Sequence, residues 1–167
     1  MERHALDLYD YHVWANEKVF KHLKELPDDI FHQELQSVFP SISAVVSHIY
    51  LVDQIWFAVM SGKSYDEIGS LISGVNERVN GRGPKAMAAL FAEAAKERRL
   101  FLTNQKDLDA SMTIHHPEFG SLDTCLSELV QHVVNHGTYH RGNISAMLNQ
   151  LGYKGVPTDY IFYLYEK

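Results

Sequence analysis

The stretch SLDTCLSELVQHVVNHGTYHRGNISAMLNQL, from Ser121 to Leu151, has an apolar residue or a histidine at every third or fourth position. These positions are Leu122, Leu126, Leu129, Val133, His136, His140, Ile144, Met147 and Leu151. Such spacing is typical of the buried face of an α-helix. It predicts one long helix from about Ser121 to Leu151, ended by Gly152, with two histidines on the face that points inward.

Three further stretches have the same helical spacing. They run from about Arg3 to Leu26, from Pro40 to Ser61-Gly62 with Ser41 as the capping residue, and from Pro84 to about Gln105. Capping serines, and prolines at the start or just past the end of a pattern, are common helix boundaries. Four amphipathic helices of this length predict an all-α fold, a four-helix bundle, formed by residues 1–167 as a single domain.

The remaining segments predict smaller elements. The sequence SMTIHHPEFGS (111–121) has β-branched residues around Pro-Glu and a glycine, which favours a small hairpin between the third and fourth helices. The sequence TDYIFYLYEK (158–167) predicts a short C-terminal helix that packs back on the bundle. The long connection GKSYDEIGSLISGVNERVNGRG (62–83) is expected to be a mobile or functional loop.

Composition excludes several classes of protein. Acidic residues outnumber basic ones, 21 to 15, which argues against a nucleic-acid partner. The chain has a single cysteine, Cys125, so it cannot form an internal disulfide, and a reducing cytoplasm is the expected compartment. No apolar run is expected to reach the ~20 residues that span a bilayer, and MERHALDLYD lacks the apolar stretch of a signal peptide. We therefore expect no membrane partner.

The two inward histidines of the last helix predict a metal site. Side chains four residues apart on a helix have β-carbons about 5–6 Å apart, so His136 and His140 can share one cation. His48 interrupts the apolar face of the second helix in the same way, which makes it the third expected ligand. The alternative at each position is a hydrogen-bonded core histidine, because burying an unpaired imidazole is costly. Imidazole ligands suit zinc, nickel, copper or iron.

Six other residues are candidates for a second shell or a pocket around this site. They are His12, Asp53, Trp56, His132, Tyr139 and Arg141. His12 is also the reserve ligand, and Asp53 could either orient a ligand imidazole or be a solvated carboxylate. Arg141 is expected to point off the buried face, toward a salt bridge or a substrate carboxylate. Trp56 and Tyr139 could line a pocket, although aromatic residues at helical spacing are more often core.

Two glycines inside the last helix need an explanation. Gly137 and Gly142 each cost about 1 kcal/mol of helix stability relative to alanine. Either a neighbouring helix approaches closely at these positions, or a ligand lies over the bare backbone beside the metal.

Four motifs together resemble the DinB family of damage-inducible proteins, within the DinB/YfiT-like superfamily. They are YHVWAN (11–16), HIYLVDQIW (48–56), NHGTYHRGN (135–143) and PTDYIFYL (157–164), and the likeness covers nearly the whole chain. The fourth-helix motif, Asn-His-x-x-x-His-Arg-Gly, is the most specific. The chain departs mildly from the family at Asn143, where Gln is common, and at Asp53, where Glu is common.

The resemblance implies a four-helix bundle that binds nickel or zinc through three histidines, matching His48, His136 and His140. Related members of the superfamily are thiol-dependent transferases and isomerases. The resemblance therefore suggests a metal-dependent enzyme of thiol-transferase or hydrolase type, acting on a small-molecule thiol or electrophilic substrate. The alternative is a non-catalytic metal-binding stress-response protein. A homodimer is expected from the family's bundles.

Overall fold

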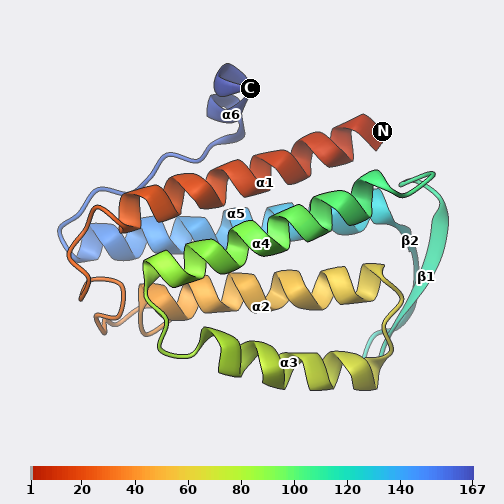
Figure 1. The fold of residues 1–167 in the computed structure, drawn as a ribbon, viewed down its shortest axis with the longest axis horizontal. Coiled ribbons are helices and arrows are strands. Elements are labelled where there is room, and N and C mark those ends of the chain that lie inside the picture. Colours follow the sequence, from red (N-terminus) through yellow and green to blue (C-terminus); the bar gives the residue numbers. More distant parts are fainter. Residues whose placement is uncertain (1) are drawn as a thin grey trace.

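The computed structural model describes residues 2–167 and consists mainly of helices (Figure 1). Its elements are α1 (Glu2–Leu23), α2 (Ile42–Met60), α3 (Tyr65–Val79), α4 (Pro84–Thr103), β1 (Ser111–His116), β2 (Gly120–Cys125), α5 (Leu126–Gln150) and α6 (Tyr160–Glu166). The mostly helical fold predicted from the sequence is confirmed, with the small hairpin between the third and fourth bundle helices and a short C-terminal helix.

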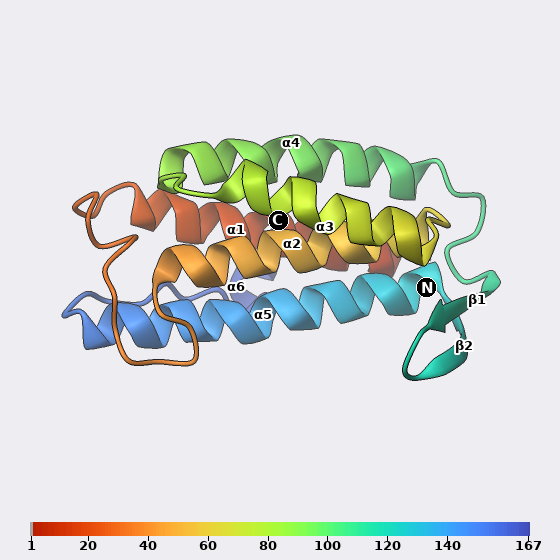
Figure 2. The ribbon, with the colours of Figure 1, turned by 90° about the horizontal axis from the view of Figure 1, so that it is seen from below.

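Four long helices form the bundle. Helix α1 packs against α4 and α5, and α2 packs against the same two neighbours from the other side. Helix α3 covers the outer face of α2, and α6 lies on α1 (Figures 1 and 2). The antiparallel hairpin β1–β2 stands at one end of the bundle, with Ser111 paired to Cys125 and His116 to Gly120.

The capping signals in the sequence explain several boundaries. The Ser41 side chain accepts a hydrogen bond from the backbone N–H of Ala44 at the start of α2. Pro84 occupies the first turn of α4, where its missing N–H costs nothing. Helix α1 ends at Leu23, earlier than the expected Leu26, because Pro27 lacks the N–H that would bond to the Leu23 carbonyl and its ring would clash with that carbonyl.

Two expectations about the helices were wrong. The connection 62–83 is not a loop: it contains α3, which begins at a reciprocal capping box between Ser64 and Glu67. Helix α5 begins at Leu126 and not near Ser121, because residues 120–125 pair with β1. Leu122 consequently lies on the hairpin, where it is 56% exposed.

Helix α2 also corrects the expectation about apolar runs. By length and composition it would be able to cross a membrane. In the bundle its apolar side chains are packed against α3, α4 and α5, and it carries the buried Asp53 in its second half. These are the contacts of a core helix.

Candidate metal centre

The three histidines expected as ligands meet between α2 and α5. One ring nitrogen each from His48, His136 and His140 lies within 4.8 Å of the others. The two Nε2 atoms of His48 and His136 are 3.2 Å apart. Ligand nitrogens 2.0–2.1 Å from a tetrahedral zinc ion would be about 3.3 Å from each other, so the spacing of this pair fits one ion.

The charge state of the rings also suits a cation. Burial, together with the neighbouring His140 and His48, lowers the pKa of His136 to about 4. Burial likewise lowers the pKa of His48, and burial followed by the nearby His48 lowers that of His140. The three imidazoles are therefore neutral at pH 7, the form in which a histidine binds a metal.

Aromatic rings surround the cluster. The Phe39 ring lies 5.1 Å from that of His48 and 5.4 Å from that of His140, measured between ring centroids. The Tyr139 ring is 5.0 Å from that of His140 and is 67% exposed, so it stands at the outer edge of the site. The sequence analysis missed Phe39. Its position two residues before the capping Ser41 was the available signal, since that places it over the first turn of α2.

Trp56 and His132 lie one turn further along the bundle. Their rings are 4.5 Å apart, and the ring of His132 is 6.4 Å from that of His136. His132 is not part of the cluster. Both residues therefore extend the aromatic border of the site.

Asn143 contacts one of the three histidines. Its side-chain amide nitrogen is 3.2 Å from Nδ1 of His140. A hydrogen-bond partner on the far nitrogen of a ligand histidine fixes the orientation of the ring. Asn143 can serve this purpose despite the family's usual Gln, because rotation of the amide presents either its oxygen or its nitrogen.

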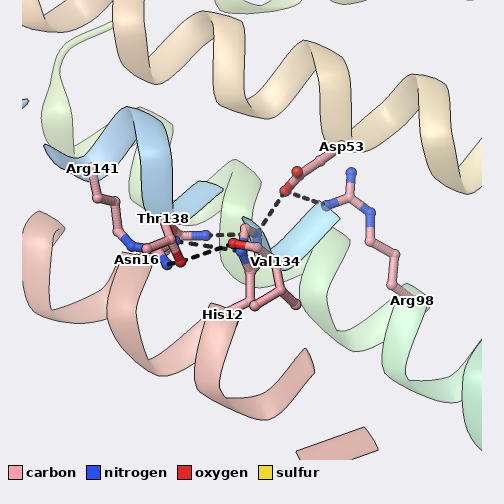
Figure 3. Close-up of polar contacts among 7 residues, drawn as sticks. All are labelled: His12, Asn16, Asp53, Arg98, Val134, Thr138 and Arg141. Carbon is pink, nitrogen blue, oxygen red and sulfur yellow. Dashed lines mark hydrogen bonds and ion pairs between the residues drawn. The ribbon is translucent and has the colours of Figure 1, made fainter. Parts of the chain in front are cut away.

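A buried polar layer crosses the bundle beneath the cluster. Each long helix contributes to it: His12 and Asn16 from α1, Asp53 from α2, Arg98 from α4 and Arg141 from α5 (Figure 3). We call these five residues the central polar layer. Apolar clusters fill the bundle on either side of the layer, so it divides the hydrophobic core in two.

Hydrogen bonds tie the layer together. Nε2 of His12 donates to Oδ2 of Asp53 at 3.0 Å, and Nη1 of Arg98 approaches the same oxygen at 3.4 Å. Nη1 of Arg141 donates to Oδ1 of Asn16 at 3.0 Å and lies 3.4 Å from Nδ1 of His12. Burial would raise the pKa of the Asp53 carboxyl, but His12 and Arg98 beside it hold it below its ordinary value. Burial lowers the pKa of His12, so this ring is neutral.

Several expectations about these residues were wrong. Asp53 is 1% exposed and is not a solvated carboxylate, and its side chain pairs with His12 and Arg98. Arg141 is 2% exposed and points into the bundle, where it donates to the side chains of Asn16 and Thr138. His12, by contrast, is a hydrogen-bonded core histidine in the central polar layer, the alternative to its reserve role as a ligand.

The two glycines of α5 have different surroundings. A Cβ atom built on Gly137 would overlap the His12 ring, whereas one on Gly142 would have open space within 4 Å. Close approach of a neighbouring helix therefore explains Gly137. It does not explain Gly142.

A cavity of about 220 Å³ lies between α1 and α4. His12, Asn16, Asp53 and Arg98 line its polar side, and none of the three clustered histidines lines it. The cavity is thus separate from the histidine cluster.

Comparison with known proteins places this geometry in a family. The family model described as "DinB family" matches residues 1–167. The chain belongs to the DinB family. It is 48% identical over 165 residues to "Protein DinB" of Bacillus subtilis (strain 168), covering 99% of this chain and 96% of that protein. The family resemblance seen in the four sequence motifs is confirmed.

A solved DinB-like structure shares the fold. The crystal structure of a DinB-like protein from Bacillus cereus ATCC 10987 superposes with a TM-score of 0.62 and 20% sequence identity. The match covers 87% of this chain and 91% of that one. This likeness supports the helical-bundle architecture of the DinB chain.

Proposed function

We propose that this DinB-family protein binds one divalent transition metal through His48, His136 and His140. The convergence of three neutral imidazoles from two helices supports this proposal, since one ring nitrogen from each lies within 4.8 Å of the others. Nickel or zinc is the expected ion, because imidazole nitrogen suits both. The three ligands carry no charge, so the ion would keep its full charge for a further ligand.

We infer further that the protein is a metal-dependent enzyme of thiol-transferase or hydrolase type. A divalent ion held by three histidines would act as a Lewis acid and lower the pKa of a bound water or thiol. The chain's own contribution is to orient the rings, through Asn143 on His140, and to border the site with Phe39 and Tyr139. In thiol transfer, sulfur bonds to an electrophilic carbon, the leaving group departs with its electron pair, and the thiol proton passes to water.

A non-catalytic metal-binding stress-response protein is the second candidate. One observation favours it: the three histidines come from two helices, with His48 and His136 88 positions apart in the chain. An ion held there would tie α2 to α5 and stabilise the fold without any reaction.

Elemental analysis tests the metal site. Protein purified without a nickel column should contain one equivalent of metal, and each alanine variant at positions 48, 136 and 140 should lose it. His132→Ala is the matched control, because His132 lies one turn away on the same helix but outside the cluster. Unchanged metal content in the His48 variant would contradict the assignment.

Turnover distinguishes the two candidate functions. Glutathione with a chlorinated nitrobenzene tests thiol transfer, and nitrophenyl esters test hydrolysis. Turnover that disappears in His136→Ala but survives in His132→Ala supports the enzyme. Metal-dependent melting with no turnover in either assay supports the stress-response protein.

The cytoplasmic location and the homodimer belong to the same proposal. A single free cysteine, Cys125, suits a reducing compartment. Analytical ultracentrifugation of the metal-bound protein would test the dimer, and fractionation of the producing cells would test the location.

A further inference from the structure

Helices α1 and α5 meet at Gly137 more closely than a side chain would permit. A Cβ atom at this position would lie 2.7 Å from Nδ1 of His12, closer still to Cε1 of the same ring, and 2.9 Å from Nη1 of Arg141. Ordinary contacts between such atoms are about 3.5 Å or longer. The missing side chain of Gly137 is thus the space into which the His12 ring fits.

The His12 ring is held in place from several sides. Its Nε2 donates to Asp53 on α2, at 3.0 Å, and its Nδ1 lies 3.4 Å from Arg141 on α5. The Tyr9 ring stacks on the His12 ring with a centroid distance of 6.1 Å, and His12 is only 1% exposed. A ring fixed in this way cannot swing aside, so a side chain at position 137 would have to displace α5 itself.

Two of the proposed metal ligands are on the same stretch of α5. His136 immediately precedes Gly137, and His140 follows three residues later. Both face His48 on α2, whereas Gly137 faces His12 on α1. The position of α5 against the His12 ring therefore decides how far these two imidazoles stand from His48.

We propose that His12 and Gly137 are positioning residues for the metal centre, through a contact that sets the distance between the α5 ligands and the α2 ligand. This inference rests on the proposed metal binding. Relieving the 2.7 Å overlap with Nδ1 to an ordinary contact requires a shift of roughly 0.8 Å, and the closer Cε1 atom requires more. Metal–ligand distances in proteins hold to within about 0.2 Å, so such a shift would disturb the site.

Gly137→Ala and Gly142→Ala form a matched pair that tests the proposal. Both exchange a glycine for alanine in the interior of α5, but only the first would meet the His12 ring. The apparent Kd for zinc, measured on folded protein by competition with a chelating dye, should rise by about tenfold to a hundredfold in Gly137→Ala, as when a group behind a ligand is removed. In Gly142→Ala it should change less than about twofold.

Removing the ring should relieve the effect. His12→Ala in the Gly137→Ala background gives the new methyl group room, so zinc affinity should recover part of its loss. The single His12→Ala variant completes the double-mutant cycle. His12→Asn replaces it in the cycle if the alanine variant fails to fold, since asparagine is shorter than histidine and keeps a donor for Asp53.

Three results would overturn the proposal. They are a wild-type Kd in folded Gly137→Ala, an equal loss in Gly142→Ala, or strictly additive effects at positions 12 and 137. Failure of the proposed metal binding has a different signature. Wild-type protein would then bind no zinc, while the melting temperatures of the metal-free variants would still show coupling between positions 12 and 137.

Discussion

His12 and Asp53 form a 3.0 Å hydrogen bond between α1 and α2, in which each residue is only 1% exposed. Around this bond the central polar layer contains one carboxylate for the two guanidinium groups of Arg98 and Arg141. Asp53 is therefore the only acidic group that the layer supplies to balance two buried positive charges.

Replacing Asp53 by alanine should strongly destabilise the protein. The change would leave the buried Arg98 guanidinium without its ion-pair partner and His12 without its acceptor, a loss of about 3–5 kcal/mol in the free energy of unfolding. Urea denaturation measures this loss. Asp28→Ala, at an exposed loop position, is the control and should stay within about 0.5 kcal/mol of wild type. A similar small change in Asp53→Ala would show that the charges are not desolvated.

The metal-free protein should lose stability as the pH falls below neutrality. The pKa of His136 is lowered from 6.5 to about 4 in the folded protein, mainly by burial, and burial also lowers that of His12. Between pH 6.5 and about pH 4, the unfolded chain binds more protons than the folded one, so acid favours unfolding. The stabilisation is complete above pH 6.5 and is lost progressively toward pH 4.

Urea denaturation in EDTA at several pH values between about 7.5 and 4.5 measures this dependence. The slope should be shallower in His136→Ala, which lacks one of the shifted groups. An unfolding free energy that stays constant over this range in the wild type would contradict the expectation.

Zinc should stabilise the wild-type protein by linking α2 to α5. At a free zinc concentration about a hundred times Kd, binding to the folded state alone adds about 2.7 kcal/mol to the free energy of unfolding. Thermal melts with zinc and with EDTA compare the two states. The stabilisation by zinc should vanish in His48→Ala, which removes the ligand from α2, and persist in His132→Ala. Equal stabilisation of both variants would place the ion elsewhere.

The capping box of α3 should contribute measurably to its stability. Ser64 Oγ accepts a hydrogen bond from the Glu67 backbone, and the Glu67 carboxylate accepts one from the Ser64 backbone N–H. Ser64→Ala should therefore cost about 1 kcal/mol. Hydrogen exchange should show faster opening of α3 amides, because α3 packs mainly on α2. Ser70→Ala, in the interior of the same helix, is the control; equal exchange in both variants would assign no role to the cap.

Sequence spacing alone predicted much of the bundle. Long helices with strong periodicity, such as α2 and α5, were found because their buried faces repeat every three or four residues. The start of α5 was placed too early because Leu122 happens to continue that period into a strand. Helix α3 was missed although Ile68, Leu71, Ile72, Val75 and Val79 recur at helical spacing, because its two glycines and the polar residues around them made the segment resemble a loop.

The sequence by itself determined that His48, His136 and His140 lie on helix faces that point inward, since polar residues in an apolar repeat are visible without coordinates. Tertiary structure alone decided what meets across the bundle: the 3.2 Å approach of His48 to His136, the burial of Arg141, and the fit of His12 against Gly137. The physical reason is that helical periodicity fixes only the direction of a side chain around its own axis. The separation and register of neighbouring helices come from packing among residues far apart in the chain.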